Sequence, residues 1–164
     1  MSSPPGRRTV LLIGYGNPGR LDDGLGPALA EAVEAMALDG VTVDADYQLT
    51  VEHAEAVARH DVVIFVDAAT EGPEPLAFTE IEPEGDVGFT THSLQPQAVL
   101  ALAHQLFAAH ARGYLLAVRG YAFNEFGQSL SDTARANLDA AIEFVAGVLR
   151  SGNMEQSQTP AKEP

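Results

Sequence analysis

The chain contains no cysteine, which excludes disulfides, thiolate nucleophiles and zinc sites built on thiolates. Basic residues are few: 9 Lys and Arg stand against 23 Asp and Glu, for a net charge of −14 at pH 7. This acidity disfavours nucleic acid and anionic membranes as partners. Long apolar runs are also missing, because no stretch approaches the roughly 18 to 20 residues of a membrane span and no apolar signal-peptide run precedes the first strand. We therefore expect a cytoplasmic protein without a nucleic-acid or membrane partner.

The length and composition predict a single domain. At 164 residues and 46% hydrophobic content, the chain can bury a full hydrophobic core. We expect a flexible arm over residues 1–7, one α/β domain over 8–150 and a disordered tail over 151–164. The tail is polar, contains proline and shows no apolar periodicity. Its deletion should therefore cost little stability or activity.

Strand and helix patterns alternate along the chain. Apolar runs predict strands over 8–14, 41–46, 62–67, 76–82 and 114–121. Apolar residues at helical spacing predict helices over 25–38, 51–59, 95–110 and 131–149. Residues 129–132 fit a capping box for the last helix. This order predicts a three-layer α/β/α sandwich around a five-stranded, mostly parallel, mixed and twisted sheet. Only residues 68–75 precede strand 76–82, too few for a parallel crossover, so that strand should run antiparallel.

The most informative segment is the turn over residues 13–26, between the first strand and the first helix. Its glycines match the dinucleotide fingerprint G-x-G-x-x-G, but Pro18 delays the helix and two adjacent carboxylates, Asp22 and Asp23, would repel phosphates. A nucleotide-binding module is therefore the weakest alternative. One of the two carboxylates is expected to cap the helix, and the other to face the crevice at the sheet edge.

A carboxylate and a histidine occur at two further positions of interest. Asp67 closes the apolar run 62–66, where it either faces the same crevice or opens the next loop. His92 precedes the helix expected over 95–110, as a ligand or as an ordinary residue of the helix start. If Asp23, Asp67 and His92 meet, they offer two oxygens and one imidazole nitrogen, which suit a borderline divalent metal with open positions.

Three motifs, in this order, carry a resemblance to a known family. Residues 14–17 and 22–26 (GYGN and DDGLG), residues 63–68 (VIFVDA) and residues 91–94 (THSL) resemble the signatures of the nickel-iron hydrogenase maturation endopeptidases. The resemblance implies an α/β/α sandwich with a five-stranded sheet. It also implies an aspartyl-type endopeptidase that removes the C-terminal extension of the hydrogenase large-subunit precursor after nickel insertion.

The resemblance further implies which residues form the site. The metal-binding positions of the family fall on Asp23, where many relatives carry Glu, on Asp67 and on His92. The nickel would be the ion of the substrate, bound transiently. Residues 119–127 resemble a subgroup with the pattern R-G-Y-x-F, which leaves open the class of hydrogenase that is processed.

Two questions stay open at this level. Either the bound metal activates the water for hydrolysis, or Asp23 or Asp67 acts as a general base on a free water. The same three ligands would also serve a non-catalytic chaperone that holds a nickel protein without cutting it.

Overall fold

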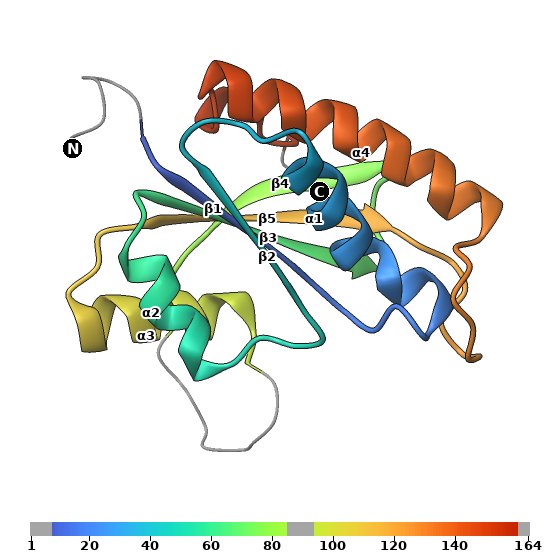
Figure 1. Cartoon of the computed structure of the whole chain (residues 1–164), viewed down its shortest axis with the longest axis horizontal. Helices are drawn as coiled ribbons and strands as arrows, with labels where there is room; N and C mark the ends of the chain where they lie inside the picture. The colour runs from blue at the N-terminus through green and yellow to red at the C-terminus, as the bar shows by residue number, and fades with distance from the viewer. Residues whose placement is uncertain (1–7, 85–93, 161–164) are drawn as a thin grey trace.

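The computed structural model describes residues 8–84 and 94–160, and these form a five-stranded sheet with helices on both faces (Figure 1). The strands lie in the order β2-β1-β3-β5-β4. Every neighbouring pair is parallel except β4 and β5. The strands are β1 (Val10–Tyr15), β2 (Val41–Asp46), β3 (Val62–Ala69), β4 (Leu76–Ile81) and β5 (Arg112–Arg119). The predicted mixed sheet, including its antiparallel strand, is thereby confirmed.

Four helices complete the sandwich, two on each face of the sheet. The helices are α1 (Leu25–Ala35), α2 (Val51–Ala58), α3 (Pro96–Phe107) and α4 (Asp132–Ser151), with short 3-10 turns at η1 (Leu21–Gly24) and η2 (Glu155–Ser157). Helices α1 and α4 share one buried apolar cluster with the sheet, and α2 and α3 share the other. The predicted three-layer α/β/α architecture is confirmed.

Strand β3 shows how one sequence run supplies both clusters. Its residues 62–66 are apolar throughout and fully buried. Successive side chains of a strand point to opposite faces. Ile64 accordingly packs with the α1–α4 layer, and Phe65 with the α2–α3 layer. A continuous apolar run is therefore what a strand covered on both faces requires.

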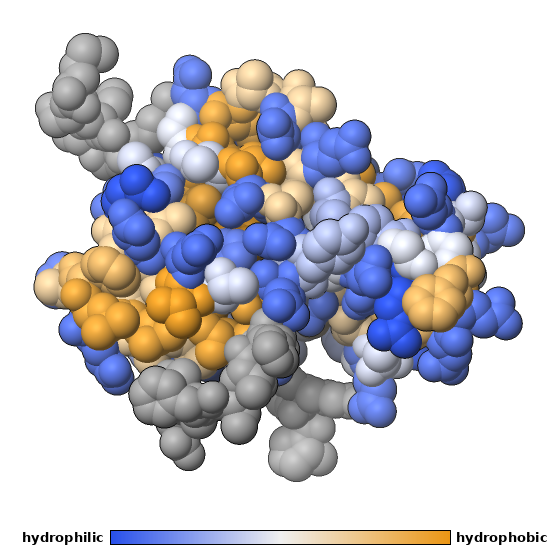
Figure 2. All heavy atoms as spheres, turned by 60° about the horizontal axis from the view of Figure 1, so that its bottom comes forward, coloured by the Kyte–Doolittle hydropathy of each residue, from blue (hydrophilic) through white to orange (hydrophobic). Residues whose placement is uncertain are grey.

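The surface is mostly hydrophilic on the side shown in Figure 2, as the net charge suggests. Apolar surface gathers on one side of the α2–α3 layer, and smaller apolar areas lie elsewhere in the same view (Figure 2). Two large side chains at the end of α3, Leu106 and Phe107, remain exposed. No helix of the described residues is both long and apolar enough to cross a bilayer.

The N-cap of the last helix lies two residues later than the capping box expected over residues 129–132 would place it. Ser131 is the N-cap of α4, and its Oγ accepts a hydrogen bond from the Ala134 N–H at 3.3 Å. The helix therefore begins one residue later than expected, and it continues to Ser151, where Gly152 ends it in the left-handed region at φ 75°. Ser131 is fixed as the cap by a carboxylate from the first turn, which is described below.

The expectation of a disordered tail is also wrong for residues 151–160, because these residues are folded onto the domain. Met154 is 1% exposed and joins the apolar cluster of α1 and α4. The N–H of Thr159 donates to the carbonyl of Phe78 at 2.8 Å, and its Oγ1 accepts from the N–H of Phe78 at 2.8 Å. The tail thus covers the outer edge of β4. The expected arm over 1–7, and residues 161–164 of the expected tail, lie outside the described residues.

Candidate active site at the first turn

The first turn depends on close approaches that only glycine permits. Gly16 follows β1 with φ 142°, and a Cβ there would lie 2.1 Å from the carbonyl oxygen of Asp23. Gly26, in the first turn of α1, is so close to β1 that a Cβ would lie 2.4 Å from the carbonyl oxygen of Tyr15. These contacts fold residues 16–26 tightly over the ends of the central strands. Both carboxylates of the turn therefore lie on η1, just before α1.

Asp22 points into the protein, where its carboxylate joins the turn to a distant loop. The side chain is fully buried. Its Oδ2 accepts from the N–H groups of Tyr121 and Ala122 and from the Oγ–H of Ser131, and its Oδ1 accepts from the N–H of Ser131, all at 2.8–2.9 Å. Burial alone would raise the pKa of Asp22, but these hydrogen bonds outweigh it and hold the pKa below its ordinary value. Asp22 is thus a structural carboxylate.

Asp23 points the other way, toward a cavity at the carboxyl ends of β1 and β3. Its Oδ2 accepts a hydrogen bond from the N–H of Asn17 at 2.8 Å, which fixes the carboxylate against the glycine turn. The side chain remains partly accessible. The expectation that one carboxylate caps α1 is wrong, because the N-cap is Gly24 and no side chain caps it. The expectation that the other faces the crevice fits the position of Asp23.

Asp67 lies near the end of β3, beside Tyr15 at the end of β1. The hydroxyl of Tyr15 donates to Oδ2 of Asp67 at 3.1 Å. Burial raises the pKa of Asp67 to about 6; the bonds from Tyr15 and from the N–H of Ala68 oppose this rise, and the charge of Asp23 adds to it. Burial, together with the adjacent carboxylate of Asp67, raises the pKa of Tyr15 as well. Asp67 therefore has a side-chain partner that holds it in one orientation.

One cavity brings the two carboxylates together. It has a volume of about 260 Å³ and is lined by Tyr15, Gly16, Asp23, Tyr47, Gln48, Leu49, Asp67, Leu94 and Gln95. The third predicted site residue, His92, lies outside the described residues. The chain re-enters the described part at Leu94, whose N–H donates to the carbonyl of Leu49 at 3.1 Å on the cavity wall.

The charged groups that the described cavity offers are two carboxylates, Asp23 and Asp67. Residues 8–84 and 94–160 contain no group of three or more His, Asp or Glu side chains placed to hold a metal ion. The two carboxylates alone offer oxygen ligands with one sign of charge, and a partly protonated carboxylate can also exchange a proton with water. A third ligand would have to come from outside these residues or from the bound molecule.

Two residues of the site were not identified from the sequence. Nothing local distinguishes the structural Asp22 from its neighbour, because its partners lie 99 to 109 positions away along the chain. Tyr15 belongs to the first motif, and its place at a strand end was the available signal.

The fold of this chain is similar to that of several proteins of known structure. Neither a family model nor the sequence of a curated protein matches the chain. A [NiFe] hydrogenase maturation protease HycI from Thermococcus kodakarensis has TM-score 0.69 and 22% identity over 89% of this chain and 95% of its own. A hydrogenase 2 maturation peptidase from a Thaumarchaeota archaeon has TM-score 0.64 and 25% identity over 87% and 98%. The endopeptidase HybD from E. coli has TM-score 0.63 and 22% identity over 88% and 94%. These likenesses confirm the fold and agree with the resemblance that the motifs carry.

Proposed function

We propose that this chain, which has the fold of the hydrogenase maturation proteases, is itself a peptidase of that kind. Its substrate would be the precursor of a nickel-iron hydrogenase large subunit, and it would remove the C-terminal extension in the cytoplasm. The observation that carries the proposal is the shared cavity of Asp23 and Asp67 at the strand ends of this fold. The similarity of the three sequence motifs supports it.

The substrate's nickel would be recognised by Asp23, Asp67 and His92. Two carboxylates and one imidazole leave coordination positions free for ligands from the precursor, so the ion could stay bound to the substrate while the site tests for its presence. Asn17 and Tyr15 orient the two carboxylates through their hydrogen bonds. Outer partners of this kind set the direction and basicity of metal ligands. Cleavage would then be restricted to nickel-loaded precursor.

For hydrolysis, one carboxylate would act as the general base. It accepts a proton from water while the water oxygen attacks the carbonyl carbon, and the proton then passes to the leaving amine. Burial together with the charge of Asp23 brings the pKa of Asp67 to about 6, close to physiological pH. Asp67 is therefore our candidate for the base, in addition to its place among the nickel ligands, whereas Asp23 would act as a ligand only.

The weakest alternative, a nucleotide-binding module, is disfavoured by the turn itself. Helix α1 begins only at Leu25, after the 3-10 turn, and the Asp23 carboxylate occupies the cavity side where a phosphate would have to lie. A non-catalytic nickel chaperone would use the same ligands, and only a cleavage assay separates it from a peptidase.

The decisive experiment mixes the purified protein with nickel-loaded large-subunit precursor from the same organism and measures the precursor mass. We expect the mass of the C-terminal extension to be lost. Asp67→Asn keeps the shape of the side chain but removes its charge, and His92→Ala removes the imidazole. Both variants should fold and lose at least about 100-fold in cleavage rate. Asp23→Glu should be milder, because it keeps a carboxylate.

The control is Asp139→Asn, a change of the same type at an exposed position on α4. It should cleave at the wild-type rate. An intact precursor with the wild-type protein would leave the chaperone as the better explanation. Normal cleavage by both Asp67→Asn and His92→Ala would show that the metal-recognition mechanism is wrong.

A further inference from the structure

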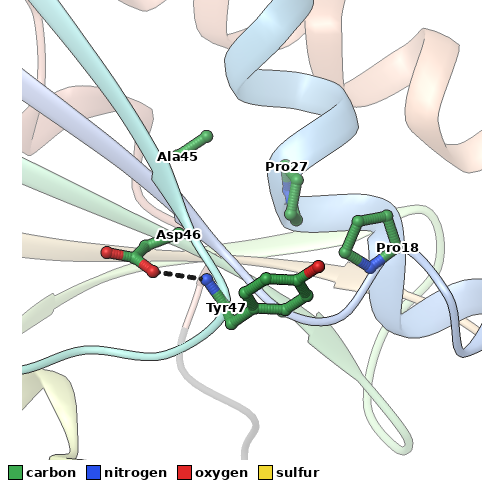
Figure 3. A pocket seen from close by; sticks show the side chains of 6 residues that line it. Pro18, Pro27, Ala45, Asp46 and Tyr47 are labelled. Carbon is green, nitrogen blue, oxygen red and sulfur yellow. Dashed lines mark hydrogen bonds between the residues drawn. The ribbon is translucent and has the colours of Figure 1, made fainter.

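The carboxylate cavity continues into a groove along the side of the molecule. Next to it lies a hollow of about 310 Å³, lined by Gly16, Pro18, Pro27, Ala45, Asp46 and Tyr47 (Figure 3). Gly16 and Tyr47 line both cavities. A third hollow of about 550 Å³ follows, lined by Pro27, Glu31, Glu34, Ala35 and Ala45. Pro27 and Ala45 line both of these hollows, so the three form one path between α1 and β2, which we call the α1–β2 groove.

The chemistry of the groove changes along its length. Beside the carboxylate cavity its walls are mainly apolar: Pro18 and Pro27 lie on the side of α1, Ala45 lies on β2, and the Tyr47 ring lies near Pro18 (Figure 3). Farther out, the charged lining residues are Glu31 and Glu34, both exposed on α1. The groove therefore offers an apolar subsite first and an anionic subsite second.

The strand that borders the groove is a free edge of the sheet. β2 is the outermost strand, so every second residue directs its N–H and C=O groups away from β1. The opposite edge, β4, is covered by the chain's own residues Gln158 and Thr159. Within residues 8–84 and 94–160, the one backbone bond at the outer edge of β2 lies at its first residue, where the N–H of Val41 donates to the Leu38 carbonyl at 3.3 Å, and no backbone segment covers the rest of that edge. An extended peptide can use such an edge for main-chain hydrogen bonds.

We propose that the α1–β2 groove binds the C-terminal extension of the precursor as an extended segment, with an apolar side chain beside Pro27 and basic side chains against Glu31 and Glu34. This proposal rests on the proposed function. Three observations carry it: the groove opens into the carboxylate cavity, its charge is complementary to a basic peptide, and its border is an unpaired strand. The extension is the occupant because a groove beside a single helix admits an extended chain, whereas the folded body of the precursor cannot enter it.

A first test needs no cleavage. The ¹⁵N-labelled protein is titrated with a short peptide in which lysine alternates with alanine and one leucine lies near the end. A counterpart carries glutamate in place of every lysine. We expect the lysine peptide to shift the amide resonances of Glu31, Glu34 and Ala45, and the glutamate peptide to leave them unchanged. Equal effects of the two peptides, shifts confined to other elements, or no shifts at all would overturn the proposal.

A second test measures steady-state cleavage of the nickel-loaded precursor. The double variant E31Q/E34Q should raise KM about three- to tenfold, the size expected for losing two exposed charge pairs, with kcat unchanged. The control D139N/E143Q removes the same charge from exposed positions on α4 and should keep the wild-type KM. A third variant, Ala45→Arg, places a long cation at the exposed groove wall and should raise KM further while leaving the thermal midpoint close to wild type.

The outcomes separate the two proposals. If the wild type cleaves and E31Q/E34Q keeps the wild-type KM, the groove assignment is wrong and the peptidase function stands. If the wild type leaves the precursor intact but the lysine peptide shifts the groove amides, the peptidase function is wrong and the groove remains a binding site for basic peptides. If E31Q/E34Q and D139N/E143Q raise KM equally, only overall charge matters and the groove assignment is wrong.

Discussion

Replacing Asp22 by Asn should destabilise the protein strongly, although the two side chains have nearly the same shape. The carboxylate accepts four hydrogen bonds in a fully buried position, three at Oδ2 and one at Oδ1. An amide has one oxygen and one NH₂ group. In either orientation of the amide, its NH₂ group faces at least one of the buried N–H groups that donate to Asp22. That N–H group is then left without an acceptor.

The magnitude follows from these bonds. One unpaired buried donor costs about 1–3 kcal/mol, and the remaining bonds weaken when their acceptor loses its charge, by roughly 1 kcal/mol in all or somewhat more. The total is about 2–4 kcal/mol of unfolding free energy, a large share of the typical 5–15 kcal/mol. For a chain of this length, the thermal midpoint should fall by about 4–16 °C.

The assay is urea unfolding followed by circular dichroism, with Asp139→Asn as the exposed control, which should stay within about 0.5 kcal/mol of wild type. The pH dependence gives a further check. The folded-state pKa of Asp22 lies below its ordinary value, so its contribution is complete above the unfolded-state pKa and is lost as the pH falls through the folded-state pKa. The difference between wild type and Asp22→Asn should therefore be largest near neutral pH and shrink in acid. An Asp22→Asn variant as stable as wild type at pH 7 would refute the assignment of Asp22 as the buried carboxylate that holds residues 121, 122 and 131.

Two further predictions concern the site and the tail. Tyr15→Phe keeps the ring in the cavity wall but removes the hydroxyl that donates to Asp67. The rate of precursor cleavage should therefore fall about 10- to 100-fold, with little change in the thermal midpoint. An unchanged cleavage rate would exclude a positioning role for Tyr15. Deleting residues 153–164 removes the buried Met154 and uncovers the edge of β4. The free energy of unfolding in urea should therefore fall by about 2–4 kcal/mol, and light scattering should show increased aggregation. A deletion variant with wild-type stability would restore the sequence-based expectation that the tail is dispensable.

The fold could be predicted because its main signals are local. The apolar run 62–66 is long enough to identify a central strand, and apolar residues at helical spacing identify the helices around it. Even the antiparallel strand β4 followed from a local fact, the short connection after β3. The position of Asp67 could be predicted for the same reason, since a residue that follows the buried apolar run of a parallel strand lies near the carboxyl edge of the sheet, where open α/β sheets bind ligands.

The tail shows where such reasoning ends. Residues 151–160 contain one buried apolar side chain, Met154. They otherwise attach through hydrogen bonds of Gln158 and Thr159 to the edge of β4 and through ion pairs of Glu155 with Arg8 and Arg112. One methionine produces no periodicity, and a hydrogen bond from Thr159 to a strand edge leaves no pattern in the sequence. The attachment depends on the position of β4, which is known only once the sheet is assembled.

The adjacent aspartates have opposite roles because of the turn on which they lie. η1 is a 3-10 helix, in which successive residues are rotated by about 120°, so neighbouring side chains cannot face the same way. Asp22 is directed inward and holds the backbone of residues 121, 122 and 131, while Asp23 is directed into the cavity. The inward carboxylate fixes the turn, and the fixed turn determines where the outward carboxylate lies. Loss of the Asp22 carboxylate should therefore impair cleavage even in molecules that remain folded, because the position of Asp23 depends on the hydrogen bonds of Asp22.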